Sequence, residues 1–407
     1  MTVDVRHLKN GIPVLMENID SIKTVSLGYF VSTGAKHELE HEHGVSHFLE
    51  HMMFKGTETR SAKAISEEID NVGGMVNAYT GRESTAYYVQ MISDKVSIGI
   101  DILSDMFLNS TFTVDNINKE RNVIIEEIRM YDDIPEEKVH EENVRFAIEG
   151  IQGKNVLGSI ESLKGIDRKV LTSYFNQRYI PENIVISVAG NIDADAVFNQ
   201  LNETIGNLEK EKVHREYDGA MVVKNGKNII KQETNQVHLC FNTLGVSNSD
   251  KDRYSVGIIS SVIGGNMSSR LFQKIREERG LAYSIYAYSS SFEEGGLFTV
   301  YAGTTHEDYK EVLELIQEEF KDIRENGITE YELQKSKNQF LSMFIFGLES
   351  SKGKMTRMAN SYMLYGRIKP IEEAIKEIEG ITVEDIKLAA RKIFDEKYYS
   401  YTVLGNV

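Results

Sequence analysis

The order of apolar and polar residues predicts strands and helices interspersed along the whole chain. Alternating positions and short apolar runs indicate strands at 24–33, 84–92, 183–189, 236–243, 296–303 and 398–404. Apolar residues at three- and four-residue spacing predict amphipathic helices at 61–72, 96–108, 114–132 and 309–325. Because several strands follow one another without an intervening helix, we expect an α+β sandwich and not a strictly alternating doubly wound sheet.

The two halves of the sequence resemble each other at an offset of about 215 residues. Thr113 and Thr329 each precede a helical pattern as expected N-caps, and Glu332 completes a capping box with Thr329. Residues 184–191 end in Ala-Gly-Asn, and residues 399–406 end in Leu-Gly-Asn. We therefore predict two structurally similar α/β-sandwich domains from an internal duplication. Their expected ranges are 1–213 and 229–407, joined by a charged linker at 214–228.

The composition narrows the class of protein. A length of 407 residues suffices for two domains, and 41% hydrophobic with 27% charged residues is typical of soluble globular proteins. A net charge of −16 argues against nucleic-acid binding, which needs clustered Lys and Arg. The one cysteine, Cys240, excludes an internal disulfide and is expected half-buried in a strand. Since no long apolar stretch or basic leader occurs, we expect no membrane association and a cytoplasmic bacterial protein.

A cluster of histidines carries the candidate chemistry. Residues 43–56 predict a helix that ends near Gly56. Its apolar stripe consists of Val45, Phe48, Leu49 and Met52. The residues His47, Glu50 and His51 fall on an adjacent stripe. Two imidazoles at i and i+4 can hold one tetrahedral zinc ion, while the carboxylate one turn along reaches water on that ion.

The alternative interpretation of these residues is a solvated helix face that binds no metal. His37 and His41 are also four apart, but they lie in a polar, Glu-rich run and are expected to be solvated. A catalytic zinc needs a third protein ligand. Glu120 and Glu127 are seven residues apart on the helix at 114–132 and so share a face, which suits one ligand and one carboxylate that orients a ligating histidine. Glu126 points elsewhere and is expected to be solvated.

These residues resemble a known family. The order H-x-x-E-H, with Glu127 placed 76 positions after His51, resembles the pitrilysin (inverzincin) family of zinc peptidases. Within it, the chain is similar to mitochondrial processing peptidase β-subunits and their bacterial homologues. Matching segments extend along nearly the whole chain, at 73–74, 77–80, 83–88, 187–191, 265–272 and 276–283.

The resemblance implies a role for each matching residue. It makes His47, His51 and Glu127 the ligands of one Zn²⁺ per chain, Glu50 the general base and Glu120 the carboxylate that orients a ligand. It implies that Arg276 and Tyr283 bind the substrate backbone and help to stabilise the tetrahedral intermediate; without it, Arg276 reads as a solvated charge. It also implies that peptide adds as a strand at the sheet edge near Asn77 and Ala78.

Assembly and function follow as expectations from the same resemblance. A chain of this length supplies half of a clamshell chamber, so we expect a homodimer whose sites are completed across subunits. The expected activity is that of a zinc metalloendopeptidase acting on short or unfolded peptides. Family members often carry a His-Pro-Leu-Gly-like turn where this chain has Gly-Ile-Gln-Gly-Lys-Asn at 150–155, a departure that bears on substrate preference.

Two alternatives are weighed against this interpretation. A non-catalytic scaffold or processing-complex subunit of the family usually carries a broken zinc motif, whereas here the motif is complete. A zinc hydrolase of non-peptide substrates fits the metal residues but not the matches at 77–78 and at Arg276 and Tyr283.

Overall fold

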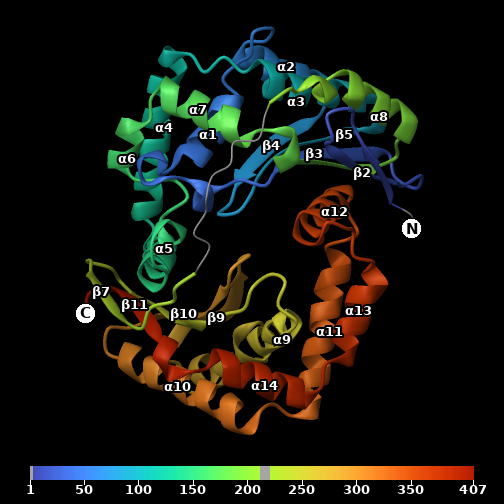
Figure 1. The fold of residues 1–407 in the computed structure, drawn as a ribbon. Helices are drawn as coiled ribbons and strands as arrows, with labels where there is room; N and C mark the ends of the chain where they lie inside the picture. Colours follow the sequence, from blue (N-terminus) through green and yellow to red (C-terminus); the bar gives the residue numbers. More distant parts are fainter. Residues whose placement is uncertain (1–2, 211–220) are drawn as a thin grey trace. The chain divides into compact units, whose positions relative to one another are not determined.

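The computed structural model describes residues 3–210 and 221–407, which form two compact units (Figure 1). The first unit consists of Met1–Ile128, Lys154–Tyr217 and Phe346–Lys369, and the second of Arg129–Gly153, Asp218–Ile345 and Pro370–Val407. Each unit thus takes in a segment from the other half of the sequence. The domain ranges expected from the duplication stay a prediction, and residues 214–220 of the expected linker lie outside the described residues.

The first unit is built on a sheet with the strand order β1-β2-β6-β3-β5-β4. The strands are β1 (Asp4–His7), β2 (Pro13–Asn18), β3 (Thr24–Val31), β4 (Met75–Thr80), β5 (Thr85–Ile92) and β6 (Ile184–Gly190). The pair β2–β6 is parallel, and the other pairs are antiparallel. Strand β3 is buried on both faces because helices cover both sides of the sheet.

Two sets of helices cover the two faces of this sheet. One face packs in a large core with helices from the first half of the sequence. These helices are α1 (Val45–Met53), α2 (Ala62–Asn71), α3 (Val96–Asn109), α4 (Val114–Asp132), α6 (Ile160–Gly165), α7 (Arg168–Arg178) and α8 (Ala194–Glu203). The other face packs against α12 (Ser351–Tyr365), whose Met355 and Met358 belong to one core cluster with Phe30 and Val185 of the sheet.

The second unit repeats this plan, which confirms the predicted duplication of the fold. Its sheet has the order β7-β11-β8-β10-β9. Setting β1 aside, this order corresponds strand by strand to that of the first sheet, including one parallel pair, β7–β11. The strands are β7 (Gly226–Lys231), β8 (Val237–Leu244), β9 (Ala282–Ser291), β10 (Gly296–Thr304) and β11 (Ser400–Gly405).

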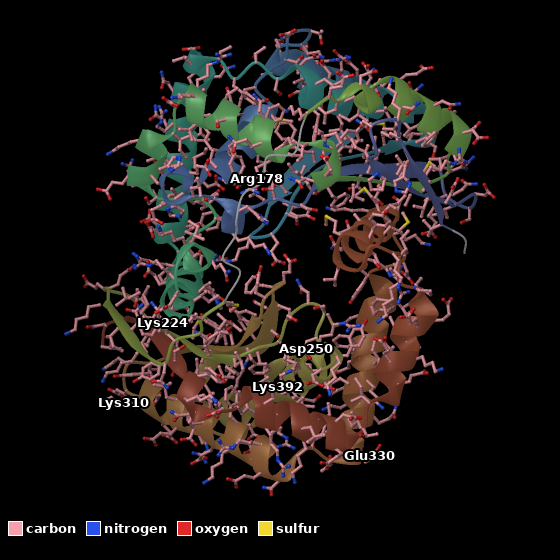
Figure 2. All side chains as sticks on the ribbon, in the orientation of Figure 1. Arg178, Lys224, Asp250, Lys310, Glu330 and Lys392 are labelled. Carbon is pink, nitrogen blue, oxygen red and sulfur yellow. The ribbon has the colours of Figure 1, made fainter. Side chains whose placement is uncertain are left out.

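Helices again lie on both faces of the second sheet. One face packs in a core with α9 (Arg253–Gly264), α10 (Tyr309–Asn326) and α14 (Val383–Ile393). The unit also contains α11 (Glu330–Phe346) and α13 (Ile371–Gly380), and the ion pair Lys392–Asp250 ties α14 to the loop before α9 (Figure 2). The opposite face packs against α5 (Pro135–Ala147), so Cys240 on β8 is fully buried and not half-buried as expected.

Most elements expected from the sequence are confirmed within about two residues, including the strands β3, β5, β6, β8, β10 and β11. The capping box is confirmed as well: the Glu332 N–H donates to Thr329 Oγ1 at 3.2 Å, and the Thr329 N–H donates to Glu332 Oε2 at 2.8 Å. None of the described helices combines the length and the apolar character that a membrane crossing needs.

Candidate metal centre

Helix α1 presents the histidine pair predicted from the sequence. Its apolar residues are buried in the core of the first unit, which fixes the rotation of the helix about its axis. His47 and His51 then lie on one side, with ring centroids 4.6 Å apart. Spacing of four residues thus brings the two imidazoles together, as the sequence predicts.

The Glu127 carboxylate of α4 lies near the Nε2 atoms of both imidazoles. Its Oε2 lies 3.7 Å from His47 Nε2 and 3.5 Å from His51 Nε2. An ion held tetrahedrally at about 2.1 Å would separate its ligand atoms by roughly 3.4 Å, so the two distances fit zinc. Among the described residues, these three side chains also form a cluster whose ligand atoms all lie within 4.8 Å of one another. The nitrogen and oxygen donors are those that zinc accepts in catalytic sites.

Glu120 supports His51 from the other side of the ring. The distance between His51 Nδ1 and Glu120 Oε1 is 2.9 Å, which leaves Nε2 of the same ring directed toward Glu127. Glu120 Oε2 pairs with Lys55 Nζ at 2.8 Å. Burial alone would raise the pKa of Glu120, but the hydrogen bonds from His51 and Lys55 outweigh it and lower this pKa. The carboxylate therefore stays charged and fixes the orientation of the ring.

His47 is held in its neutral form. Burial, and to a smaller extent the neighbouring His51, lowers the pKa of His47 to about 3. Neutral imidazole is the form that binds metal. In the described part of the chain, His47 Nδ1 is buried without a hydrogen-bond partner, whereas Nε2 lies near Glu127.

Glu50 lies on α1 between the two histidines in sequence and accepts a hydrogen bond from the Thr80 hydroxyl of β4. Burial raises the pKa of Glu50, and the charge of Glu127 adds to this, while the bond from Thr80 and the nearby His51 oppose it. A carboxylate with a raised pKa is a better proton acceptor than an exposed one. The sequence did not single out Thr80 as its partner.

Asn77 and Ala78 lie on β4, the last strand of the first sheet in the described ranges. In an antiparallel pair, hydrogen-bonded and non-hydrogen-bonded residue pairs alternate. Because the Gly81 N–H donates to Ser84 O, this alternation makes Ala78–Tyr87 a non-hydrogen-bonded pair. The backbone groups of Ala78 therefore point to the open edge, where its N–H donates to the Asn77 side chain at 2.8 Å.

Arg276 and Tyr283 belong to the second unit and lie side by side there. Arg276 is on a π-helical turn (Phe272–Glu277), and its Cζ lies 5.5 Å from the Tyr283 ring centroid near the start of β9. Tyr283 is 74% exposed. Both side chains are thus available to a ligand.

One expectation about the loop before α1 is wrong, and one buried residue of this loop was overlooked. His37 is partly buried, and its Nδ1 accepts from the Gly34 N–H at 3.1 Å, so it is not solvated as expected. His41 is exposed, as expected. Glu38, which the sequence interpretation passed over as part of a polar run, is 4% exposed. Its carboxylate accepts from the N–H groups of Gly44 and Ser46. Burial raises the pKa of Glu38 to about 7 against the effect of these bonds.

Comparisons with known proteins bear on the class to which this chain belongs. The profile described as "Insulinase (Peptidase family M16)" matches residues 13–153, and the one described as "Peptidase M16 inactive domain" matches residues 165–340. The chain is 37% identical to the "uncharacterized zinc protease YmxG" of Bacillus subtilis, with 96% of this chain and 95% of that one covered. The chain belongs to peptidase family M16. It is also 33% identical to the "uncharacterized zinc protease ML0855" of Mycobacterium leprae, covering 98% of this chain and 90% of the relative.

Solved structures share the fold. A peptidase M16 inactive domain structure from Pseudomonas fluorescens superposes with a TM-score of 0.92 at 18% identity, covering 100% of this chain and 98% of that one. A protease from Helicobacter pylori gives 0.89 at 19% identity, with 99% of both chains covered. In the M16 chain described here, α9 takes the place of α1 in the second unit, and its sequence contains no His, Asp or Glu. The histidine pair of α1 thus has no counterpart on α9.

Proposed function

We propose that this M16 protein is a zinc metalloendopeptidase that hydrolyses short or unfolded peptides. The observation that carries the proposal is the convergence of His47, His51 and Glu127 at zinc-ligand spacing, with Glu50 on the same helix as both histidines. The relatives named as zinc proteases support the choice of metal.

Each residue has a distinct task in this proposal. His47, His51 and Glu127 would hold one Zn²⁺, which supplies a Lewis acid that lowers the pKa of bound water. Glu50 accepts a proton from the attacking water and returns it to the leaving amine. Thr80 orients the Glu50 carboxylate through its hydroxyl, and Glu120 orients the His51 ring.

Substrate would bind by adding a strand to β4. The outward N–H of Ala78 can donate to a peptide carbonyl after it releases its hydrogen bond to the Asn77 side chain. Main-chain hydrogen bonds of this kind recognise an extended backbone and not a particular side chain. This supports short or unfolded peptides as the substrate class.

We further propose that the active form is a homodimer in which Arg276 and Tyr283 complete the site of the partner subunit. Tyr283 is exposed and Arg276 is partly exposed, and the guanidinium beside the phenol ring presents donors that can stabilise a developing oxyanion. In this arrangement each chain contributes half of a clamshell chamber that encloses the peptide.

The proposal is tested by cleavage of an unstructured peptide of mixed sequence, followed by mass spectrometry. Activity should be lost on chelation and should return with Zn²⁺. Glu127→Gln should lose zinc on dialysis, whereas Glu126→Gln, an exposed neighbour on the same helix, should retain it. Zinc bound at wild-type stoichiometry without cleavage of any peptide would favour the scaffold alternative, and metal loss in the Glu126 variant alone would reverse the ligand assignment.

A further inference from the structure

The loop that leads into α1 ends in an unusual helix start. Gly44 precedes the helix with a φ of 89° and offers no side chain to cap it. The cap comes instead from Glu38: its Oε2 accepts from the Gly44 N–H at 2.7 Å, and its Oε1 from the Ser46 N–H at 2.8 Å. Ser46 is the residue directly before His47.

A buried hydrogen-bond network holds the same end of the helix. Ser46 Oγ lies 2.8 Å from the Tyr174 hydroxyl of α7, and this hydroxyl lies 3.2 Å from Thr33 Oγ1, two residues beyond β3. Arg178, labelled in Figure 2, donates to the His37 carbonyl at 2.8 Å and so fixes the loop next to Glu38. The first turn of α1 is thereby connected to α7 and to the sheet.

Burying a carboxylate at this position has a cost. A carboxylate that leaves water destabilises a protein unless hydrogen bonds or opposite charges replace its hydration. Two short bonds to backbone N–H groups and the positive end of the helix dipole offset that cost. A serine or aspartate at the position of Gly44 would cap an ordinary helix more simply. The Glu38 arrangement differs in that it links the helix start to a loop six residues away.

We propose that Glu38 is a positioning residue for the metal centre. It fixes the first turn of α1 so that His47 Nε2 stays opposite Glu127, just as Glu120 fixes His51 at the other end of the helix. The two ligands of α1 are thus each held by a separate buried carboxylate. The inference rests on the proposed zinc site, but it does not depend on which bond the enzyme cleaves.

The test compares two buried carboxylates of one loop. Glu38→Gln keeps the size of the side chain but turns an N–H₂ group toward one of the two N–H donors. Glu42→Gln is the matched control: Glu42 is 2% exposed and accepts from the Leu39 N–H at 2.9 Å, within the loop itself. Tyr174→Phe is a milder variant that removes the hydroxyl bond to Ser46. The probes are Zn²⁺ affinity by chelator competition and the visible absorption spectrum of the Co²⁺ form at saturation.

Glu38→Gln should weaken zinc binding by about tenfold or more, the range for residues that orient ligands, and should change the Co²⁺ spectrum at saturation. Tyr174→Phe should also weaken zinc binding and change the Co²⁺ spectrum, but by less. If Glu38→Gln does not fold, the Tyr174→Phe result tests the inference in its place. Glu42→Gln should keep both properties of the wild type. An unchanged spectrum and affinity in Glu38→Gln, or equal changes in Glu42→Gln, would overturn the inference. Because neither readout uses peptide, a wild type that binds metal but cleaves nothing refutes the proposed function alone.

Discussion

Glu120 Oε1 lies 2.9 Å from His51 Nδ1, on the side of the imidazole away from Nε2. This contact fixes the ring and makes Nε2 a better donor to a metal ion. Glu120→Gln should therefore reduce zinc affinity by about tenfold or more, since a neutral amide holds the ring less firmly and leaves Lys55 without its ion pair. Chelator competition measures the effect, with Glu126→Gln as the control. Equal affinities in the two variants would show that Glu120 does not support the ligand.

Ala78→Pro should weaken peptide cleavage while zinc stays bound. Proline removes the outward N–H of Ala78, and proline is tolerated on an edge strand where the N–H faces away from the neighbouring strand. One lost main-chain hydrogen bond is worth about 0.5–1.5 kcal/mol, so kcat/KM should fall by about two- to thirteenfold. Ala78→Ser keeps the N–H and should cleave like the wild type. If Ala78→Pro has wild-type kcat/KM, peptide does not pair with β4 at this residue.

The second unit should lose stability in mild acid because of His140. This residue of α5 lies between the hydroxyls of Tyr288 and Tyr286, at 2.8 and 2.9 Å. Burial lowers the pKa of His140, and His238 lowers it further, while Glu136 opposes the shift. The folded protein therefore favours the neutral ring. The neutral His140 ring therefore contributes fully to the free energy of unfolding above the unfolded pKa of about 6.5. This contribution is lost progressively as the pH falls below that value.

Chemical unfolding of His140→Gln between pH 8 and pH 5 checks this expectation. The free energy of unfolding of the wild type should fall more steeply below pH 6.5 than that of the variant, by at most about 1.4 kcal/mol per pH unit. His306→Gln is the control, since the His306 side chain is 65% exposed. Parallel curves for His140→Gln and the wild type would show that His140 does not couple to folding.

Mixing two inactive variants should restore activity if the site is shared between subunits. A Glu50→Gln chain still offers Arg276 and Tyr283, and an Arg276→Ala chain still offers its metal site. At equal mixing about half of the dimers are mixed and contain one complete site, so about a quarter of wild-type activity should return. Mass-tagged chains confirm the exchange. Activity that stays flat after confirmed exchange would mean that Arg276 serves its own chain or no site.

Periodicity placed His47 and His51 on one helix face and offered both Glu120 and Glu127 as partners, whereas the choice of Glu127 as the ligand came from the family resemblance. His47 and His51 share a face of α1 because Phe48 and Leu49 bury the neighbouring face, and Glu127 follows Glu120 by two turns of α4. Strands such as β3 and β10 were equally clear, because both are almost continuous apolar runs. In these elements the local pattern and the tertiary packing agree.

The environment of Glu38 and Cys240 could not be read from the local sequence. Glu38 stands in a charged run that resembles a solvated loop, and its two donors become visible only when the chain folds back onto the start of α1. One indication of this role for Glu38 was present in the sequence: Gly44, at the start of α1, has no side chain that could cap the helix. Cys240 is fully buried because α5, from the other half of the sequence, covers its face of the second sheet.

The central claim, that Glu50 is the general base of a zinc peptidase, is tested most directly by Glu50→Gln. The amide keeps the shape of the side chain but cannot accept the proton from water. Zinc content and peptide cleavage should be measured on the same preparation of the variant and of the wild type. We predict wild-type zinc content with turnover at least about a hundredfold lower, the usual contribution of general acid–base catalysis. A zinc-loaded Glu50→Gln protein that cleaves the peptide at a rate near that of the wild type would contradict the account.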